Sequence, residues 1–267
     1  MTNIPPVIKE TLSTYEKFLL SEFPAELIIE TYLYGSITLG AFEVNSSDID
    51  FVTVIKRPLT IREENTLKEV HKKMAGIPYG DRMDGMYLTR ENLGKKNRDL
   101  EPYLYCAEGE LHKGHWDINA VTWYGLKAAN TRILHKTDHQ LNYEISWKDV
   151  KEEMKYNLYS YWKGKIEKAP LYVPNEWVEF AVSTLCRILI TLEEERIVSK
   201  REALIKVRDR FNGRFSELIQ KALSIREGKS GESASEDMTR ETIYFIECVL
   251  DFCEDRFFNE KMVSKTE

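Results

Sequence analysis

The sequence contains few residues that break regular structure or cross-link a chain. Its 267 residues include 13 glycines, 8 prolines and 4 cysteines. Glycine and proline together fall below their usual share of roughly 12%, which excludes collagen-like and low-complexity proteins. The cysteines show no C-x-x-C spacing, so we interpret them as thiols in a reducing compartment and not as a disulfide framework. We therefore expect a helix-rich globular protein in the cytoplasm.

Long apolar runs and an excess of basic residues are also missing. No segment approaches the ~18 consecutive apolar residues that a membrane span requires, and residues 1–20 carry charges and prolines where a signal peptide is apolar. Acidic residues outnumber basic ones, 44 to 38. Because phosphate binding needs clustered Lys and Arg, we expect neither a nucleic acid nor a membrane as partner. The acidic balance instead suits a cationic small molecule.

Hydrophobic periodicity divides the chain into an α/β part and a helical part. We predict an α+β fold, with an N-terminal domain of mixed sheet and helices over residues 1–140 and a C-terminal all-α bundle over residues 141–267. Residues 92–115 are expected to be irregular, and the glycine- and serine-rich segment 228–237 to be a flexible linker. Strands are expected at 27–34, 48–55 and 82–88, and helices at 8–21, 60–75, 147–163, 175–195, 199–210, 213–226 and 238–258.

The segment LYGSITLGAFEVNSSDID, residues 33–50, concentrates the residues that can perform chemistry. Gly35 lets the backbone approach a ligand closely, and Ser36 adds a hydroxyl at the expected start of a short helix, whose unpaired N–H groups suit a phosphate. Asp48 and Asp50 are two residues apart in the next strand, so they share a face, ~6.6 Å apart along the chain. Such a pair needs a cation, and Mg²⁺ binds through one or two carboxylates plus substrate phosphates.

This order of strand, Gly-Ser, helix, Asp-x-Asp and strand resembles the nucleotidyltransferase superfamily with a polymerase-β-like fold. The whole chain is similar, more narrowly, to the streptomycin/spectinomycin adenylyltransferases, in the order of its two parts and in the run from Leu185 to Ala203. The resemblance implies ATP as co-substrate, one or two Mg²⁺ ions, and transfer of AMP to a hydroxyl of an aminoglycoside-type antibiotic, streptomycin or spectinomycin. Such an activity confers resistance.

The resemblance also implies which carboxylates act. Asp48 and Asp50 are expected to hold the metal, and Asp84 occupies the place of a third carboxylate that serves as general base and metal ligand. That residue is usually Glu in the family, one methylene longer than the Asp84 found here. Asp81 is the rival for the role, but Asp84 lies within the apolar strand, between Met83 and Gly85.

Four residues are expected to bind ATP. Gly35 and Ser36 correspond to the phosphate cradle of the family, and Arg187 and Lys200 correspond to its phosphate-binding cations. The sequence supports Arg187 independently, because it lies about 200° around the helix from Leu185 of the apolar stripe.

Acidic and aromatic side chains are the candidates for binding a cationic acceptor. Glu176, Trp177 and Trp116 are the predicted drug-binding residues, and His112 and His115 are interpreted as solvent-exposed loop residues. The other acidic candidates are Glu108, Glu110, Asp117, Asp149 and Glu179.

Other functions stay open on the sequence. The acceptor could be a lincosamide or a compound that is not a drug, and an antitoxin-type nucleotidyltransferase would modify a toxin protein. A catalytically silent relative would only bind nucleotide or a partner. The expected oligomeric state is a monomer or a weak dimer.

Overall fold

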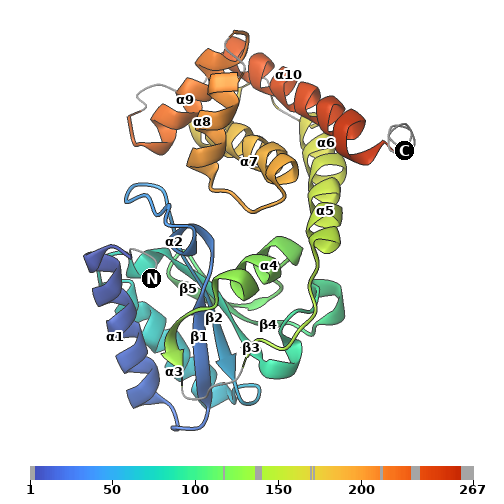
Figure 1. The fold of residues 1–267 in the computed structure, drawn as a ribbon. Helices are drawn as coiled ribbons and strands as arrows, with labels where there is room; N and C mark the ends of the chain where they lie inside the picture. Colours follow the sequence, from blue (N-terminus) through green and yellow to red (C-terminus); the bar gives the residue numbers. More distant parts are fainter. Residues whose placement is uncertain are drawn as a thin grey trace. The chain divides into compact units, whose positions relative to one another are not determined.

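The computed structural model describes residues 4–116, 118–135, 140–168, 170, 172–210, 213–229 and 235–259. The chain divides into two compact units, Met1–Ser146 (unit 1) and Trp147–Glu267 (unit 2), and each unit is described by itself (Figure 1). The sequence places this boundary slightly earlier, at residue 140. The predicted linker lies partly in residues 230–234, outside the described residues.

Unit 1 is built on a six-stranded sheet with the order β5-β4-β3-β2-β1-β6. Of the strand pairs in the described residues, β2–β3 is parallel and the others are antiparallel, which confirms the predicted mixed sheet. The strands are β1 (Ile28–Leu33), β2 (Ile49–Ile55), β3 (Met83–Thr89), β4 (Tyr103–Ala107), β5 (Glu110–Gly114) and β6 (Thr131–His135).

The β4–β5 hairpin shows that the prediction of irregular structure for residues 92–115 is wrong over 103–114. Its two-residue turn consists of Glu108 and Gly109, both with positive φ, 52° and 76°. Such turns favour Asn-Gly or Asp-Gly. A glutamate at the first position is a weak signal, so the sequence does not reveal the hairpin.

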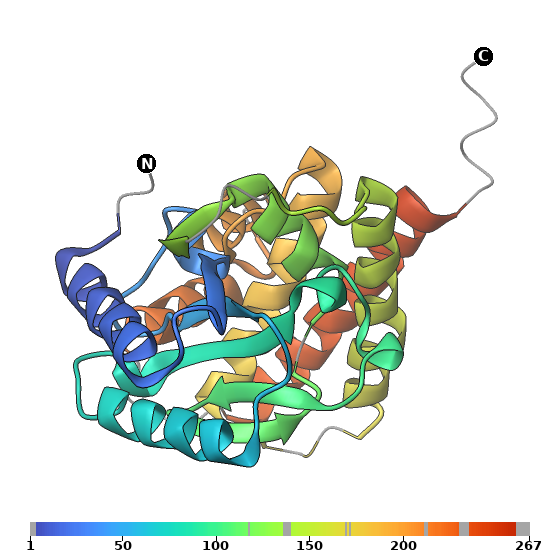
Figure 2. The ribbon, with the colours of Figure 1, turned by 90° about the horizontal axis from the view of Figure 1, so that it is seen from below.

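Helices cover both faces of the sheet. The helices α1 (Pro6–Glu22) and α3 (Ile61–Met74) lie side by side on one face (Figure 2), where they bury apolar residues such as Leu12 and Leu67 against Phe51 of the sheet. The helix α4 (Ala120–Ala129) packs Trp123 on the other face. Shorter helical segments are α2 (Gly35–Thr38), η1 (Gly80–Arg82), η2 (Arg90–Asn92) and η3 (Asn97–Asp99).

A chain of buried polar side chains crosses the core beneath α1 and α3. The Tyr87 hydroxyl lies 2.5 Å from the Tyr15 hydroxyl and 2.6 Å from His71 Nε2, and Tyr15 in turn lies 3.2 Å from the Thr53 hydroxyl. His71 is 1% exposed, and its Nδ1 has no hydrogen-bond partner. Burial lowers the pKa of His71 from 6.5 to about 4, because the charged imidazolium loses its hydration.

This burial predicts a pH-dependent stability. Between pH 6.5 and pH 4 the unfolded chain binds a proton at His71 that the folded protein does not, so the contribution is complete above pH 6.5 and is lost as the pH falls toward 4. Lowering the pH from 7 to 5 should reduce the free energy of unfolding, measured in urea, in the unsubstituted protein. In His71→Gln this reduction should be smaller by on the order of 2 kcal/mol. His112→Gln, at an exposed position, should keep the full pH dependence; an equal dependence in all three proteins would contradict the prediction.

Unit 2 is helical, as predicted. Its central helix α7 (Asn175–Glu194) packs against α8 (Lys200–Arg210), α9 (Ser216–Arg226) and α10 (Glu236–Cys253). The predicted helix 147–163 is instead three segments in succession, α5 (Trp147–Tyr156), the π-helical η4 (Asn157–Trp162) and α6 (Lys163–Ile166), and the π-helical η5 (Glu254–Phe258) follows α10. No described helix combines the length and the hydropathy that crossing a bilayer requires.

Candidate active site

Gly35 brings the backbone directly against the carboxylate of Asp50. Gly35 has φ +67°, and a Cβ built on it would lie 1.9 Å from Asp50 Oδ2. The Tyr34 N–H also donates to the Asp50 carbonyl, at 3.1 Å. The glycine is therefore required twice, for its left-handed conformation and for this close approach.

Ser36 follows in α2, which is a single turn of four residues. The expectation that a helix N-terminus supplies the phosphate site is therefore too strong, because one turn aligns few peptide dipoles. The Ser36 Oγ is buried and has no hydrogen-bond partner. An orphaned hydroxyl of this kind beside Gly35 can bind a polar ligand atom.

The predicted carboxylates lie where the two central strands of the sheet, β2 and β3, begin. In the parallel β2–β3 pair, Asp50 is the register partner of Asp84, so the two side chains are neighbours on one face. Asp48 directly precedes β2. A cavity of about 310 Å³ is lined by Asp48, Asp81, Arg82, Asp84 and Glu108.

Asp84 titrates unusually high for a carboxyl. Burial, with a smaller contribution from the charge of Asp48, raises the pKa of Asp84 from 3.8 to about 6. The Glu108 N–H donates to Asp84 Oδ1, at 3.2 Å, and opposes this rise. A carboxylate whose pKa approaches neutrality is suited to accept a proton in catalysis.

The carboxylates at the beginning of β2 and β3 provide oxygen ligands of the kind that a hard divalent cation prefers, but they do not form a complete site for one. Within the part of the chain that the structure describes, no group of three or more His, Cys, Asp or Glu side chains is arranged to hold a metal ion. The predicted metal site of Asp48, Asp50 and Asp84 is therefore not preformed. Mg²⁺ commonly takes only one or two protein carboxylates and completes its shell with water and substrate phosphates, so the oxygen donors present remain suitable.

Arg187 and Lys200 lie in unit 2. Between residues 181 and 192 of α7, all of which are described, Arg187 alone is not buried. The Lys200 Nζ lies 5.2 Å from the ring centroid of Phe180, and Phe180 is seven residues before Arg187, hence on the same side of α7. Arg187 is thus off the buried stripe, as the sequence indicates, although Ser183, Thr184 and Thr191 of the same helix are buried.

The predicted drug-binding residues have different surroundings. Glu176 is exposed at the first turn of α7, whereas Trp177 is partly buried against Trp162, with ring centroids 6.3 Å apart. Trp116 stacks on Tyr105, at 5.0 Å and 21°, and His112 stacks on the same Tyr105, at 5.2 Å. His112 is therefore a strand residue in a ring stack, and its assignment to a loop is wrong.

The acidic candidates also separate. Glu108 lines the cavity beside Asp84, and Glu110 is exposed on β5. Glu179 forms an ion pair with Arg226, at 2.9 Å, and both side chains are largely buried, so its charge is already neutralised. Asp117 lies outside the described residues.

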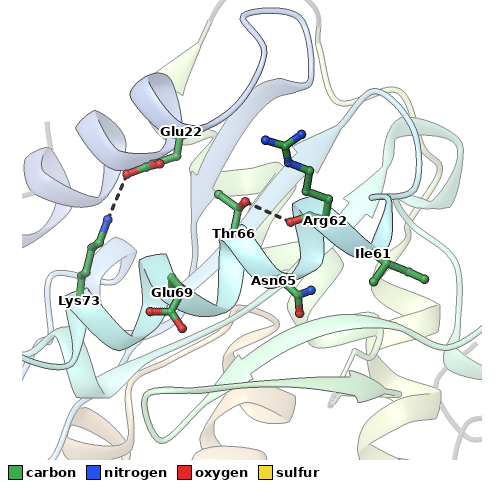
Figure 3. A pocket seen from close by; sticks show the side chains of 7 residues that line it. All are labelled: Glu22, Ile61, Arg62, Asn65, Thr66, Glu69 and Lys73. Carbon is green, nitrogen blue, oxygen red and sulfur yellow. Dashed lines mark hydrogen bonds and ion pairs between the residues drawn. The ribbon is translucent and has the colours of Figure 1, made fainter.

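A second, larger groove lies away from these residues, along α3. Figure 3 shows its polar lining and the ion pair between Lys73 and Glu22, at 3.1 Å. The groove has a volume of about 660 Å³, but none of the predicted site residues lines it. It is lined by Glu22, Ile61, Arg62, Asn65, Thr66, Glu69 and Lys73.

Comparisons with known proteins assign a domain family to each part of the chain. Residues 12–103 match the nucleotidyltransferase domain, and residues 143–250 match the C-terminal domain of aminoglycoside adenylyltransferases. The chain belongs to the aminoglycoside adenylyltransferase family. It is 24% identical over 215 residues to spectinomycin 9-adenylyltransferase of Enterococcus faecalis, which covers 71% of this chain and 78% of that protein.

The fold also resembles a solved structure of this family. The crystal structure of the Enterococcus spectinomycin adenyltransferase with ATP and spectinomycin matches with a TM-score of 0.66 and 18% identity, over 91% of this chain and 98% of that one. The nucleotidyltransferase fold of unit 1 and the helical fold of unit 2 are thereby confirmed. The chain is thus a nucleotidyltransferase with the two-part organisation of its family.

Two groups that contact the site residues were not recognised in the sequence. Arg82, two residues before Asp84, reaches the loop that leads into β2, and the Glu108 backbone reaches Asp84. The contacts of Arg82 had no clear signal in the sequence, because they join it to residues 35 and more positions earlier in the chain. The Glu108 contact had no signal, because it depends on a hairpin that the sequence does not reveal.

Gly35 offers a test of the site with an internal control. In Gly35→Ala the new Cβ collides with Asp50, and we expect AMP transfer to fall by about 10²-fold or more, since displacements of about 1 Å have effects of this size. Gly40 has nearly the same φ, +65°, but no atom lies within 4 Å of a Cβ built on it. Gly40→Ala should therefore lose about 1–2 kcal/mol of stability through strain and keep its turnover. Equal activity losses in the two variants, measured by pyrophosphate release, would show that strain alone accounts for the effect.

Proposed function

We propose that this protein transfers AMP from ATP to a hydroxyl of an aminoglycoside-type antibiotic, with Mg²⁺ as the metal. The observation that carries the proposal is the pairing of Asp50 with Asp84 across parallel strands, with Gly35 against the Asp50 carboxylate. Family membership supports the reaction class. Resistance to the antibiotic would follow from its modification.

Asp84 acts as the general base in this proposal. Its carboxylate accepts the proton of the acceptor hydroxyl as the hydroxyl oxygen attacks the α-phosphorus of ATP. A P–O bond forms to the acceptor, the bond to the β-phosphate breaks, and pyrophosphate leaves. Its pKa of about 6 leaves Asp84 mostly ionised at neutral pH and still basic enough to take the proton.

The remaining residues bind and orient the triphosphate. Asp48 and Asp50 would hold Mg²⁺, whose charge offsets that of the phosphates and stabilises the transition state. The Ser36 hydroxyl, buried without a partner, donates to a phosphate oxygen next to Gly35. Arg187 and Lys200 are the proposed cationic residues for the triphosphate. Because phosphoryl transfer needs little covalent help, positioning and charge account for most of the rate.

Spectinomycin and streptomycin are the acceptors that we favour. The similar curated protein and the similar solved structure are both named as a spectinomycin adenylyltransferase of Enterococcus. The cavity beside Asp84 is lined by four carboxylates and one arginine, which suits a cation. Glu176, Trp177 and Trp116 stay proposed as acceptor-binding residues. A lincosamide, a compound that is not a drug and a toxin protein are the alternative acceptors.

Substitutions at Asp84 separate the base from a metal ligand. Asp84→Asn should lower AMP transfer by at least about 10²-fold while leaving the affinity for MgATP within about threefold. Asp84→Glu should keep substantial activity, because the carboxylate is retained. Asp81→Asn removes another carboxylate of the same cavity and should keep its kcat, with at most a higher KM for a cationic acceptor. If Asp84→Asn loses MgATP binding in proportion to turnover, measured by calorimetry, Asp84 is chiefly a metal ligand.

A panel of acceptors tests the substrate class. We expect pyrophosphate release from MgATP with spectinomycin or streptomycin, and none with lincosamides, which lack the same density of positive charge. Kanamycin-type aminoglycosides serve as cationic controls with different hydroxyl positions. Tight ATP binding without turnover on the whole panel would overturn the antibiotic assignment and favour another acceptor.

A further inference from the structure

One arginine holds the loop that leads into β2. The Arg82 guanidinium donates from Nη1 to the Val44 carbonyl, at 2.7 Å, and from Nη2 to the Ser47 carbonyl. Its Nε lies 3.8 Å from Asp48 Oδ1. Three groups of the short stretch 44–48 thus contact a single side chain, which comes from the residue just before β3.

The strand register explains why this arginine meets this loop. In the parallel pair, Ile49 is the partner of Met83, so Asp48 and Arg82 directly precede matched positions. The loop and the arginine therefore approach the sheet side by side. The same register then pairs Asp50 with Asp84, and the anchored loop ends at the carboxylates of the site.

Arg82 is itself held in place. Its guanidinium lies 5.5 Å from the ring centroid of Tyr79, and the Tyr79 ring meets Phe42 edge-on, at 6.1 Å. The turn between Tyr79 and Arg82 is closely packed, because a Cβ on Gly80 would lie 1.8 Å from the Met74 carbonyl oxygen. Tyr79 thus contacts the loop at Phe42, and Arg82 contacts it between Val44 and Asp48.

The contacts of Arg82 favour holding the loop over neutralising the carboxylate. The Nε–Oδ1 separation of 3.8 Å is longer than a hydrogen bond, whereas two other nitrogens bond loop carbonyls. The guanidinium has the planar, forked set of donors that such a two-carbonyl contact requires, and lysine has not. Fixing the loop before the ligand arrives removes an ordering cost from binding.

We propose that Arg82 is the positioning residue for Asp48, and that it fixes loop 42–48 so that Asp48 can bind the metal of MgATP. This inference rests on the proposed function, in which Asp48 is a metal ligand. Neither of its two measurements, loop exchange and Mn²⁺ binding, includes an acceptor, so an incorrect acceptor assignment leaves it unaffected.

The first measurement is amide hydrogen exchange of the protein without ligand. The Ser46 and Ser47 N–H groups donate to the Glu43 carbonyl, at 3.2 and 2.9 Å, and report directly on loop order. In Arg82→Gln these amides should exchange about tenfold faster, because local opening becomes easier. Arg98→Gln is the matched control, since Arg98 Nε also lies 3.8 Å from an aspartate oxygen, in Asp99. Exchange in Arg98→Gln should stay unchanged.

The second measurement is Mn²⁺ binding in the presence of ATP, followed by electron paramagnetic resonance. Arg82→Gln should raise the half-saturating Mn²⁺ concentration about tenfold, as the loss of supporting residues around metal ligands commonly does. Arg82→Lys should give an intermediate value, and it carries the test if Arg82→Gln does not fold. In the Asp48→Asn background, Arg82→Gln should have little further effect.

Three results would overturn the inference. One is that Arg82→Gln and Arg98→Gln show the same loop exchange and the same Mn²⁺ binding. If Arg82→Gln does not fold, Arg82→Lys takes its place in this comparison. Another is an undiminished effect of Arg82→Gln on Mn²⁺ binding in the Asp48→Asn background, which would mean that Arg82 acts independently of Asp48. The third is faster loop exchange with unchanged Mn²⁺ binding, which would leave Arg82 a purely structural residue.

Discussion

The parallel pairing of β2 with β3 is the constraint on which the site depends. In a parallel pair, residues in register point the same way, so the register that aligns Ile49 with Met83 also places Asp50 beside Asp84. A slip of one residue would send one of the carboxylates to the opposite face. The apolar residues that follow on both strands, including Val52 and Met86, are fully buried and thereby fix the register. The same strand register therefore sets both the packing of the core on this face and the positions of the carboxylates.

Like charges brought together must be supported by their surroundings. Asp84 shows this in its raised pKa, which arises from burial first and from Asp48 second. Two groups beside these charges are the Glu108 N–H, which donates to Asp84, and Arg82, which donates to the preceding loop and lies 3.8 Å from Asp48 Oδ1. Within the described residues these oxygen donors do not form a complete metal site, and Mg²⁺ commonly takes only one or two carboxylates from a protein.

Close packing against the glycine backbone limits the sequence at two points near the site. Gly35 accommodates the Asp50 carboxylate and Gly80 accommodates the Met74 carbonyl, and in each case a methyl group would overlap an oxygen. These glycines flank the two segments that deliver the carboxylates. In unit 2, Arg187 interrupts the buried stretch of α7.

The sequence by itself determined the elements that depend on local pattern. The apolar runs predicted β1, β2 and β3, and the 3.6-residue period predicted α7. The Gly-Ser and Asp-x-Asp spacing predicted that Gly35, Ser36, Asp48 and Asp50 share one site, whereas Asp84 was expected there through the family resemblance. Tertiary structure decided what depends on distant segments. The β4–β5 hairpin has Glu108 where its turn usually has Asn or Asp. The contacts of Arg82 with Val44 and Ser47 span 38 and 35 residues of sequence, and the ion pair between Glu179 and Arg226 joins two helices. Local pattern records which face of an element is buried, but it carries no information on the partner that a charged side chain meets across the fold.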